Sequence, residues 1–358
     1  MKSRINEPLY AAFAWAFLLL SGCSDAQENM EEAQIAPTTP LQVNVLKTAT
    51  TGARSVISAA TDLDKIAVYA QSTTTNTSAT GNNRAIYVRT PAGSTDAYTW
   101  EMESSPRILL SAEIADVYAY YPSTLTLSDA DAQSGSTLPL SLLTAETAIE
   151  LPPGGFTGGK TYTASAETDY LWATPVQASN GKAANPKGTT YQINLTMNHA
   201  LAQICFRIYK DATYTNAGVL TKIQVKNLKT GDALKMNISN GNISLGKETT
   251  TTFTRTPGDS GYTLTTLGPS PGPSALDNLP AFGILVLPDA TTNKSGMSAC
   301  FIIDGKEYAV AFSGTEKKWE AGKNYRYTIR LSGTAATLTG IHAQPWNDNG
   351  AGQENDIY

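Results

Sequence analysis

Cys23 is the residue whose chemistry is easiest to predict from its neighbours. It directly follows Gly22, and a run of apolar residues from Leu9 to Leu20 lies just before this pair. Lys2 and Arg4 make the start of the chain basic. A helix needs about 20 apolar residues to cross a bilayer, so this shorter run predicts an export signal and not a membrane anchor.

A Cys directly after small residues at such a site is typical of a bacterial lipoprotein. Its thiol would form a thioether with a diacylglyceryl group, the chain would be cut after Gly22, and the new amino group would be acylated. Several acyl chains anchor a protein stably in a membrane, whereas one chain does not. We therefore expect residues 1–22 to be a signal peptide and Cys23 to tether the exported chain to a membrane. An ordinary signal peptide with an incidental Cys is the alternative.

Residues that could support catalysis or bind a metal ion are scarce. The chain has 2 histidines, His199 and His342, and neither lies beside an acidic or nucleophilic motif. The sequence has no nucleophile elbow, phosphate-binding loop, zinc-protease motif or pair of closely spaced cysteines. Its Asp residues are scattered in turns, where Asp is common. The sequence predicts no enzyme, no cofactor and no metal site, and His199 is expected to cap or pack at the start of a strand.

The tryptophans leave a binding function open. They could form a platform on which sugar rings stack, or they could anchor hydrophobic cores, since aromatic side chains bury large areas. We favour core anchors. One candidate function is therefore that of a surface lipoprotein that binds a glycan or a host protein and does not polymerise. The residues concerned are Trp100, Trp172, Trp319 and Trp346.

The bulk composition indicates an exported protein made of strands and turns. Of its 358 residues, 41% are hydrophobic and only 16% are charged, while Thr, Ser, Gly, Asn and Ala are abundant. A formal net charge of −5 gives no reason to expect nucleic-acid binding. Cys205 and Cys300 lie in apolar, strand-like runs, so they are either two buried thiols, which we favour, or one disulfide.

Hydrophobic patterning predicts an all-β protein. Leu41–Val45 alternates strictly, and Lys65–Ala70 and Asp116–Pro122 are apolar or aromatic runs rich in β-formers. Asn240-Gly241 and Asp304-Gly305 have the composition of two-residue hairpin turns. No segment has a convincing helical period. We predict two tandem β-sandwich domains.

Composition also suggests where these domains begin and end. Residues 23–40 are acidic, polar and rich in Pro and Thr, so they are expected to be a flexible tether. The segment from Asn180 to Gly188 is rich in Gly, Asn and Lys and is the preferred boundary. The predicted domains are therefore residues 41–190 and 191–358, the second with a C-terminal arm.

Several motifs, in order along most of the chain, resemble the fimbrillin family of Bacteroidetes pili, in particular its Mfa-like branch. Each motif is weakly specific by itself, and the set is more specific than its members. The motifs are Leu20-Ser21-Gly22-Cys23, Lys65–Ala70, Val117–Pro122, Asn198–Ala202, Gly322–Tyr327 and Ile341–Trp346.

The resemblance implies transthyretin-like sandwich domains with an Ig-like Greek-key topology, and a structural role in fimbriae that support adhesion. In this family a trypsin-like protease cuts the loop after the first strand, which releases that strand together with the lipid. Arg54 stands in the corresponding loop, and Lys47 is an alternative site. The family often has Thr-Arg here, whereas this chain has Ala53-Arg54, so Arg54 could instead be an ordinary solvated residue.

Loss of the first strand would remove Leu41, Val43 and Val45 from a core. At about 1.5–3 kcal/mol for each buried side chain, the three represent roughly 5–9 kcal/mol at most. The groove left behind would favour a strand from another subunit, a donor-strand exchange. The expected donor is the C-terminal segment, with Leu338, Ile341 and Trp346. Expected partners are therefore other fimbrial subunits, the outer membrane and the maturation protease.

Overall fold

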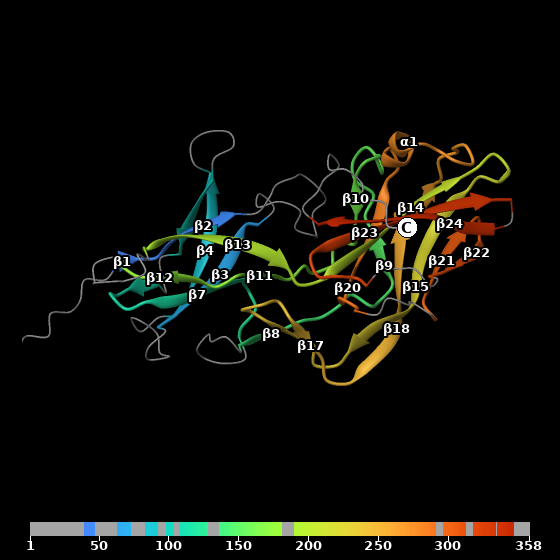
Figure 1. Cartoon of the computed structure of the whole chain (residues 1–358). Helices are drawn as coiled ribbons and strands as arrows, with labels where there is room; N and C mark the ends of the chain where they lie inside the picture. Colours follow the sequence, from blue (N-terminus) through green and yellow to red (C-terminus); the bar gives the residue numbers. More distant parts are fainter. Residues whose placement is uncertain are drawn as a thin grey trace, which may run out of the picture. The chain divides into compact units, whose positions relative to one another are not determined.

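The structure is a computed structural model, and its fold is almost entirely β, as the sequence predicts (Figure 1). One short helix, α1 (Pro273–Asp277), accompanies the strands in the described part of the chain. No helix among these residues is long and apolar enough to span a membrane. The described residues are 39–46, 63–72, 83–91, 98–103, 107–127, 136–180, 190–290, 296–312, 318–333 and 335–346.

The first large sheet contains most of the N-terminal strands and curls around its own core. β2 and β5 are its two end strands, and they also pack against each other. β12 (Val176–Ala178) adds to β7, and β1 (Thr39–Pro40) pairs separately with β6 (Leu109–Leu110). In spatial order the strands are β2 (Gln42–Leu46), β13 (Gln192–His199), β11 (Leu171–Ala173), β7 (Ala115–Tyr121), β3 (Lys65–Ser72), β4 (Arg84–Pro91) and β5 (Tyr98–Met102).

Both faces of this sheet are covered near its centre, which explains why Ile66–Ala70 of β3 and Val117–Tyr121 of β7 are all apolar or aromatic. Ile66 and Val68 of β3 point into the core that the sheet encloses. Tyr69, on the other face, stacks on Tyr120 of β7 in a second cluster that includes Met236. A strand buried on both faces needs apolar residues at every position instead of alternation.

Two further sheets face each other in the C-terminal half, around a core that includes Phe206, Phe301 and Tyr327. One sheet has the order β10 (Thr161–Tyr162), β20 (Ala281–Val286), β14 (Ala202–Lys210), β23 (Lys323–Ser332) and β24 (Ala335–Pro345). The other has the order β22 (Lys306–Ala311), β21 (Ser298–Ile303), β15 (Val219–Gly231), β18 (Glu248–Pro257) and β9 (Thr147–Ile149), with β19 (Tyr262–Thr263) paired to β15. A small sheet joins β17 (Ile243–Ser244), β16 (Lys235–Asn237) and β8 (Thr137–Pro139).

One of the two predicted hairpin turns is confirmed. Asp304 and Gly305 alone connect β21 and β22, and both have positive φ angles, 49° and 75°. These angles suit the right-handed twist of the flanking strands. The prediction for Asn240-Gly241 is wrong in length, because the whole segment 238–242 separates β16 from β17.

Strand pairing crosses the predicted domain boundary at residue 190. β13 comes after that residue, yet it pairs with β2 and β11 of the first sheet. β9 and β10 come before it, yet they pair with β18 and β20 of the C-terminal sheets. A division by sheet membership would assign β13 to the first domain, and β9 and β10 to the second. The limits 41–190 and 191–358 stay a prediction.

The two cysteines are separate buried thiols, the alternative that we favour from the sequence. Cys205 lies on β14 between two residues of the core, Ile204 and Phe206. Cys300 lies on β21 between Ala299 and Phe301, which also belong to that core. Because side chains alternate along a strand, the two thiols point away from the core on opposite sheets, which prevents a disulfide.

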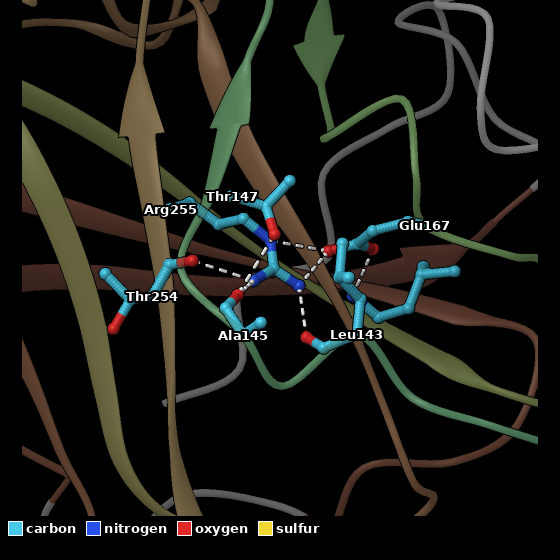
Figure 2. A network of polar contacts seen from close by, with 7 residues as sticks. Leu143, Ala145, Thr147, Glu167, Thr254 and Arg255 are labelled. Carbon is cyan, nitrogen blue, oxygen red and sulfur yellow. Dashed lines mark hydrogen bonds and ion pairs between the residues drawn. The ribbon is translucent and has the colours of Figure 1, made fainter.

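A buried ion pair ties the connecting segments to the C-terminal sheets (Figure 2). Arg255 of β18 donates through Nε to Glu167 Oε1 at 2.8 Å and through its two terminal nitrogens to the carbonyls of Thr254, Ala145 and Leu143. Glu167 Oε2 accepts the backbone N–H of Leu285 at 2.8 Å. Burial raises the pKa of Glu167 to about 7, although Arg255 and this N–H act in the opposite direction.

Candidate functional site

The candidate site consists of β2, the strand predicted to be released, and β24, the last strand of the described chain. β2 lies at one end of the first sheet, and among the described strands it pairs only with β13, in parallel. In this register Val43 lies beside Ile193, and Val45 beside Leu195. An edge strand shares backbone hydrogen bonds with one neighbour, so fewer bonds oppose its removal than for a central strand.

The side chains of this strand alternate between core and solvent, as its sequence predicts. Leu41, just before β2, is 1% exposed, Val43 is 7% exposed and Val45 is 6% exposed. All three belong to the core enclosed by the first sheet. Gln42 and Asn44 are exposed. The predicted apolar face of the strand is therefore present, while its displacement during maturation stays a prediction.

Leu41 is also held through its backbone. Its N–H donates to the carbonyl of Ile108 at 3.1 Å, and its carbonyl accepts the hydroxyl of Tyr87 at 2.7 Å. Burial raises the pKa of Tyr87 above its ordinary value, so this hydroxyl stays a donor. The strand is thus fixed at its start by polar contacts and along its length by its apolar side chains.

The segment predicted as the donor arm is folded onto its own chain. β24 pairs with β23 in an antiparallel ladder from Ala335 to Pro345 and forms an end strand of its sheet. Leu338 and Ile341 are partly buried and pack against the C-terminal core. Hence this segment could join another subunit only after it separates from β23. Its role as a donor stays a prediction.

Trp346, directly after β24, is buried in a cluster that sequence reasoning does not reveal. The indole stacks on the ring of His199, with centroids 4.0 Å apart and planes 6° apart. His199 Nδ1 lies 2.9 Å from Asp169 Oδ2. The backbone N–H of Trp346 donates to the backbone carbonyl of Gly322 at 2.9 Å. His199 packs in the interior, but it is the last residue of β13 and not at the start of a strand, so the predicted position is wrong. Its two partners are distant in sequence, and no local pattern points to them.

The four tryptophans differ in their surroundings. Trp319 and Trp346 are buried in hydrophobic cores, and Trp100 is partly buried against the core of the first sheet. These three are core anchors, as we favour from the sequence. Trp172 is partly buried, packs against the cluster that contains Tyr69 and Met236, and lines a cavity.

The other predicted site residues lie outside the described part of the chain. These are Gly22 and Cys23 of the export signal and Arg54 of the predicted cleavage site. The described residues contain no group of His, Cys, Asp and Glu side chains arranged to hold a metal ion.

Comparison with known proteins finds one matching family model and several solved structures of similar fold. A family model described as Fimbrillin-like matches residues 49–346. A crystal structure of a candidate cell adhesion protein from Bacteroides uniformis is 19% identical and has a TM-score of 0.55, with 86% of this chain and 99% of that chain covered. A candidate cell adhesion protein from Bacteroides ovatus is 13% identical with a TM-score of 0.55, and 87% and 98% are covered. A search of curated proteins finds no match.

Proposed function

Because the chain belongs to the fimbrillin-like family, we propose that it is a structural subunit of cell-surface fimbriae that support adhesion. It reaches the outer membrane as a lipoprotein through Cys23. A trypsin-like protease then cuts after Arg54, and the subunit assembles with others by donor-strand exchange. The family match also supports a structural role instead of an enzymatic one.

One observation carries the assembly step: an end strand fills a core through three buried side chains. Leu41, Val43 and Val45 lie on the segment that cleavage after Arg54 would detach. Their burial represents roughly 5–9 kcal/mol at most, comparable with the 5–15 kcal/mol that stabilises a typical domain. A chain without this strand would therefore gain stability by accepting an apolar strand from a neighbour.

The donor in this proposal is the neighbour's β24. Its pairing with β23 and the stacking of Trp346 on His199 hold it on its own chain before assembly. Exchange would replace these contacts with contacts to the next subunit. Polymerisation is thus expected to be slow before cleavage and favourable after it, because only cleavage opens a groove for the donor.

Mass spectrometry of the N-terminus tests the proposal directly. Protein shed from the cell surface is expected to begin at Ser55, and membrane-bound precursor at a lipidated Cys23. An Arg54→Ala variant should stay uncut and monomeric, whereas the matched control Lys47→Ala should still mature and form oligomer ladders. Wild-type protein that keeps residues 24–54 and stays monomeric after brief trypsin treatment would refute the assembly step.

A further inference from the structure

We propose that the cavity beside Trp172 is a binding site for a neutral carbohydrate. The cavity has a volume of about 370 Å³ and lies between β11, the end of β13, the 240–242 turn and Ala321–Gly322. Ligand sites commonly have volumes of about 300–1,000 Å³ and combine an apolar surface with a few placed polar groups. This volume is at the small end of that range and suits one or two sugar rings.

The lining of the cavity favours an uncharged ligand. None of the described residues that line it is Asp, Glu, Lys or Arg. His199 is the one titratable side chain there, and its Nδ1 is held by the carboxylate of Asp169. A phosphate or carboxylate ligand would need a cationic partner, and an amine would need an anionic one. A neutral polar molecule needs neither.

Three asparagines supply hydrogen-bonding groups for such a molecule. Asn198, Asn240 and Asn242 all line the cavity. Asn198 Nδ2 donates to the carbonyl of Thr196 at 3.2 Å, and Asn240 Oδ1 accepts the N–H of Asn242 at 2.9 Å. Each of these bonds uses one of the hydrogen-bonding groups of its amide, which has two donors and an acceptor. Sugar hydroxyls both donate and accept, so they match groups of this kind.

Trp172 supplies the aromatic surface and is held in place by a glycine. A Cβ atom added to Gly241 would lie 2.0 Å from Trp172 Nε1, and Gly241 has a φ angle of +69°. The turn therefore comes this close to the indole only because residue 241 has no side chain. An indole fixed in this way offers a pre-organised apolar surface for the C–H groups of a sugar ring.

His199 and Gly322, which line the cavity, also contact Trp346, so departure of Trp346 in strand exchange would alter this end of the cavity. The inference rests on the cavity of a single chain, which does not involve β2. It gives the adhesion function a chemical target.

Saturation-transfer NMR on residues 24–358 tests the inference. The probes are methyl glycosides of glucose, galactose, mannose and N-acetylglucosamine, with lactose and cellobiose. Glucuronic acid and N-acetylneuraminic acid are the charged comparisons. At least one neutral probe should bind, and Trp172→Phe and Asn242→Ala should each weaken its binding at least fivefold.

Two matched controls lie away from the cavity. Trp100→Phe changes a partly buried tryptophan on β5, and Asn194→Ala removes an exposed amide from β13. Both variants should bind the neutral probe as the wild type does. The inference is overturned if no neutral probe binds, if only the charged sugars bind, or if Asn242→Ala, at an exposed position, binds with unchanged affinity.

Discussion

The contribution of the first strand to stability can be measured in the intact chain by alanine substitution. Leu41→Ala removes three buried carbon atoms, and Val43→Ala and Val45→Ala remove two each. At about 0.8 kcal/mol per carbon, the losses are about 2.4 kcal/mol for Leu41 and about 1.6 kcal/mol for each valine. The triple variant should therefore lose about 5–6 kcal/mol of unfolding free energy, and more if the cavities do not collapse.

Urea denaturation of residues 24–358 measures this loss, with each single variant analysed before the triple variant. The same strand provides the control, since Gln42 and Asn44 point to solvent, where their side chains bond to Gln192 and Asn194. Their double substitution with Ala should change the unfolding free energy by no more than about 0.5 kcal/mol per site. If the triple variant loses no more than this control, the strand does not complete a core, and strand exchange has no driving force.

Three further predictions concern the interior. Trp346→Ala should lower the unfolding free energy by about 3–5 kcal/mol in denaturant titration, because it empties the stack on His199; Trp346→Phe should lose much less, and equal losses would contradict a stacking role. Folding raises the pKa of Glu167 from 4.5 to about 7, so the folded state favours the protonated carboxyl. The stability that this shift contributes is fully present below pH 4.5 and is lost as pH rises through about 7. The unfolding free energy of the wild type, relative to Glu167→Gln, should therefore fall by up to about 1.4 kcal/mol per unit between pH 5 and 7, and a constant difference would mean that Glu167 is ionised throughout. Cys205 and Cys300 should react with a thiol reagent at two equivalents in denaturant and far more slowly in buffer, since both are buried; fast reaction of either in buffer would refute its burial.

Local patterns in the sequence predict much of the secondary structure, and they predict which face of the first strand is buried. Alternation along Leu41–Val45 predicts which side chains are buried, because successive residues of a strand point to opposite faces. Asp304-Gly305 predicts its turn, because few residue pairs adopt two positive φ angles easily. These features depend on neighbours a few positions away, so the sequence contains the information needed.

Other features depend on which distant segments meet, and only the tertiary structure decides them. Arg255 pairs with Glu167, and His199 lies between Asp169 and Trp346, although the partners are far apart along the chain. The cavity beside Trp172 exists because two turns and two strands converge on it. The sequence by itself determined an all-β chain with an amphipathic first strand. The partner of each strand and the groups that share an interior site follow from long-range packing, which leaves no periodic pattern in the local sequence.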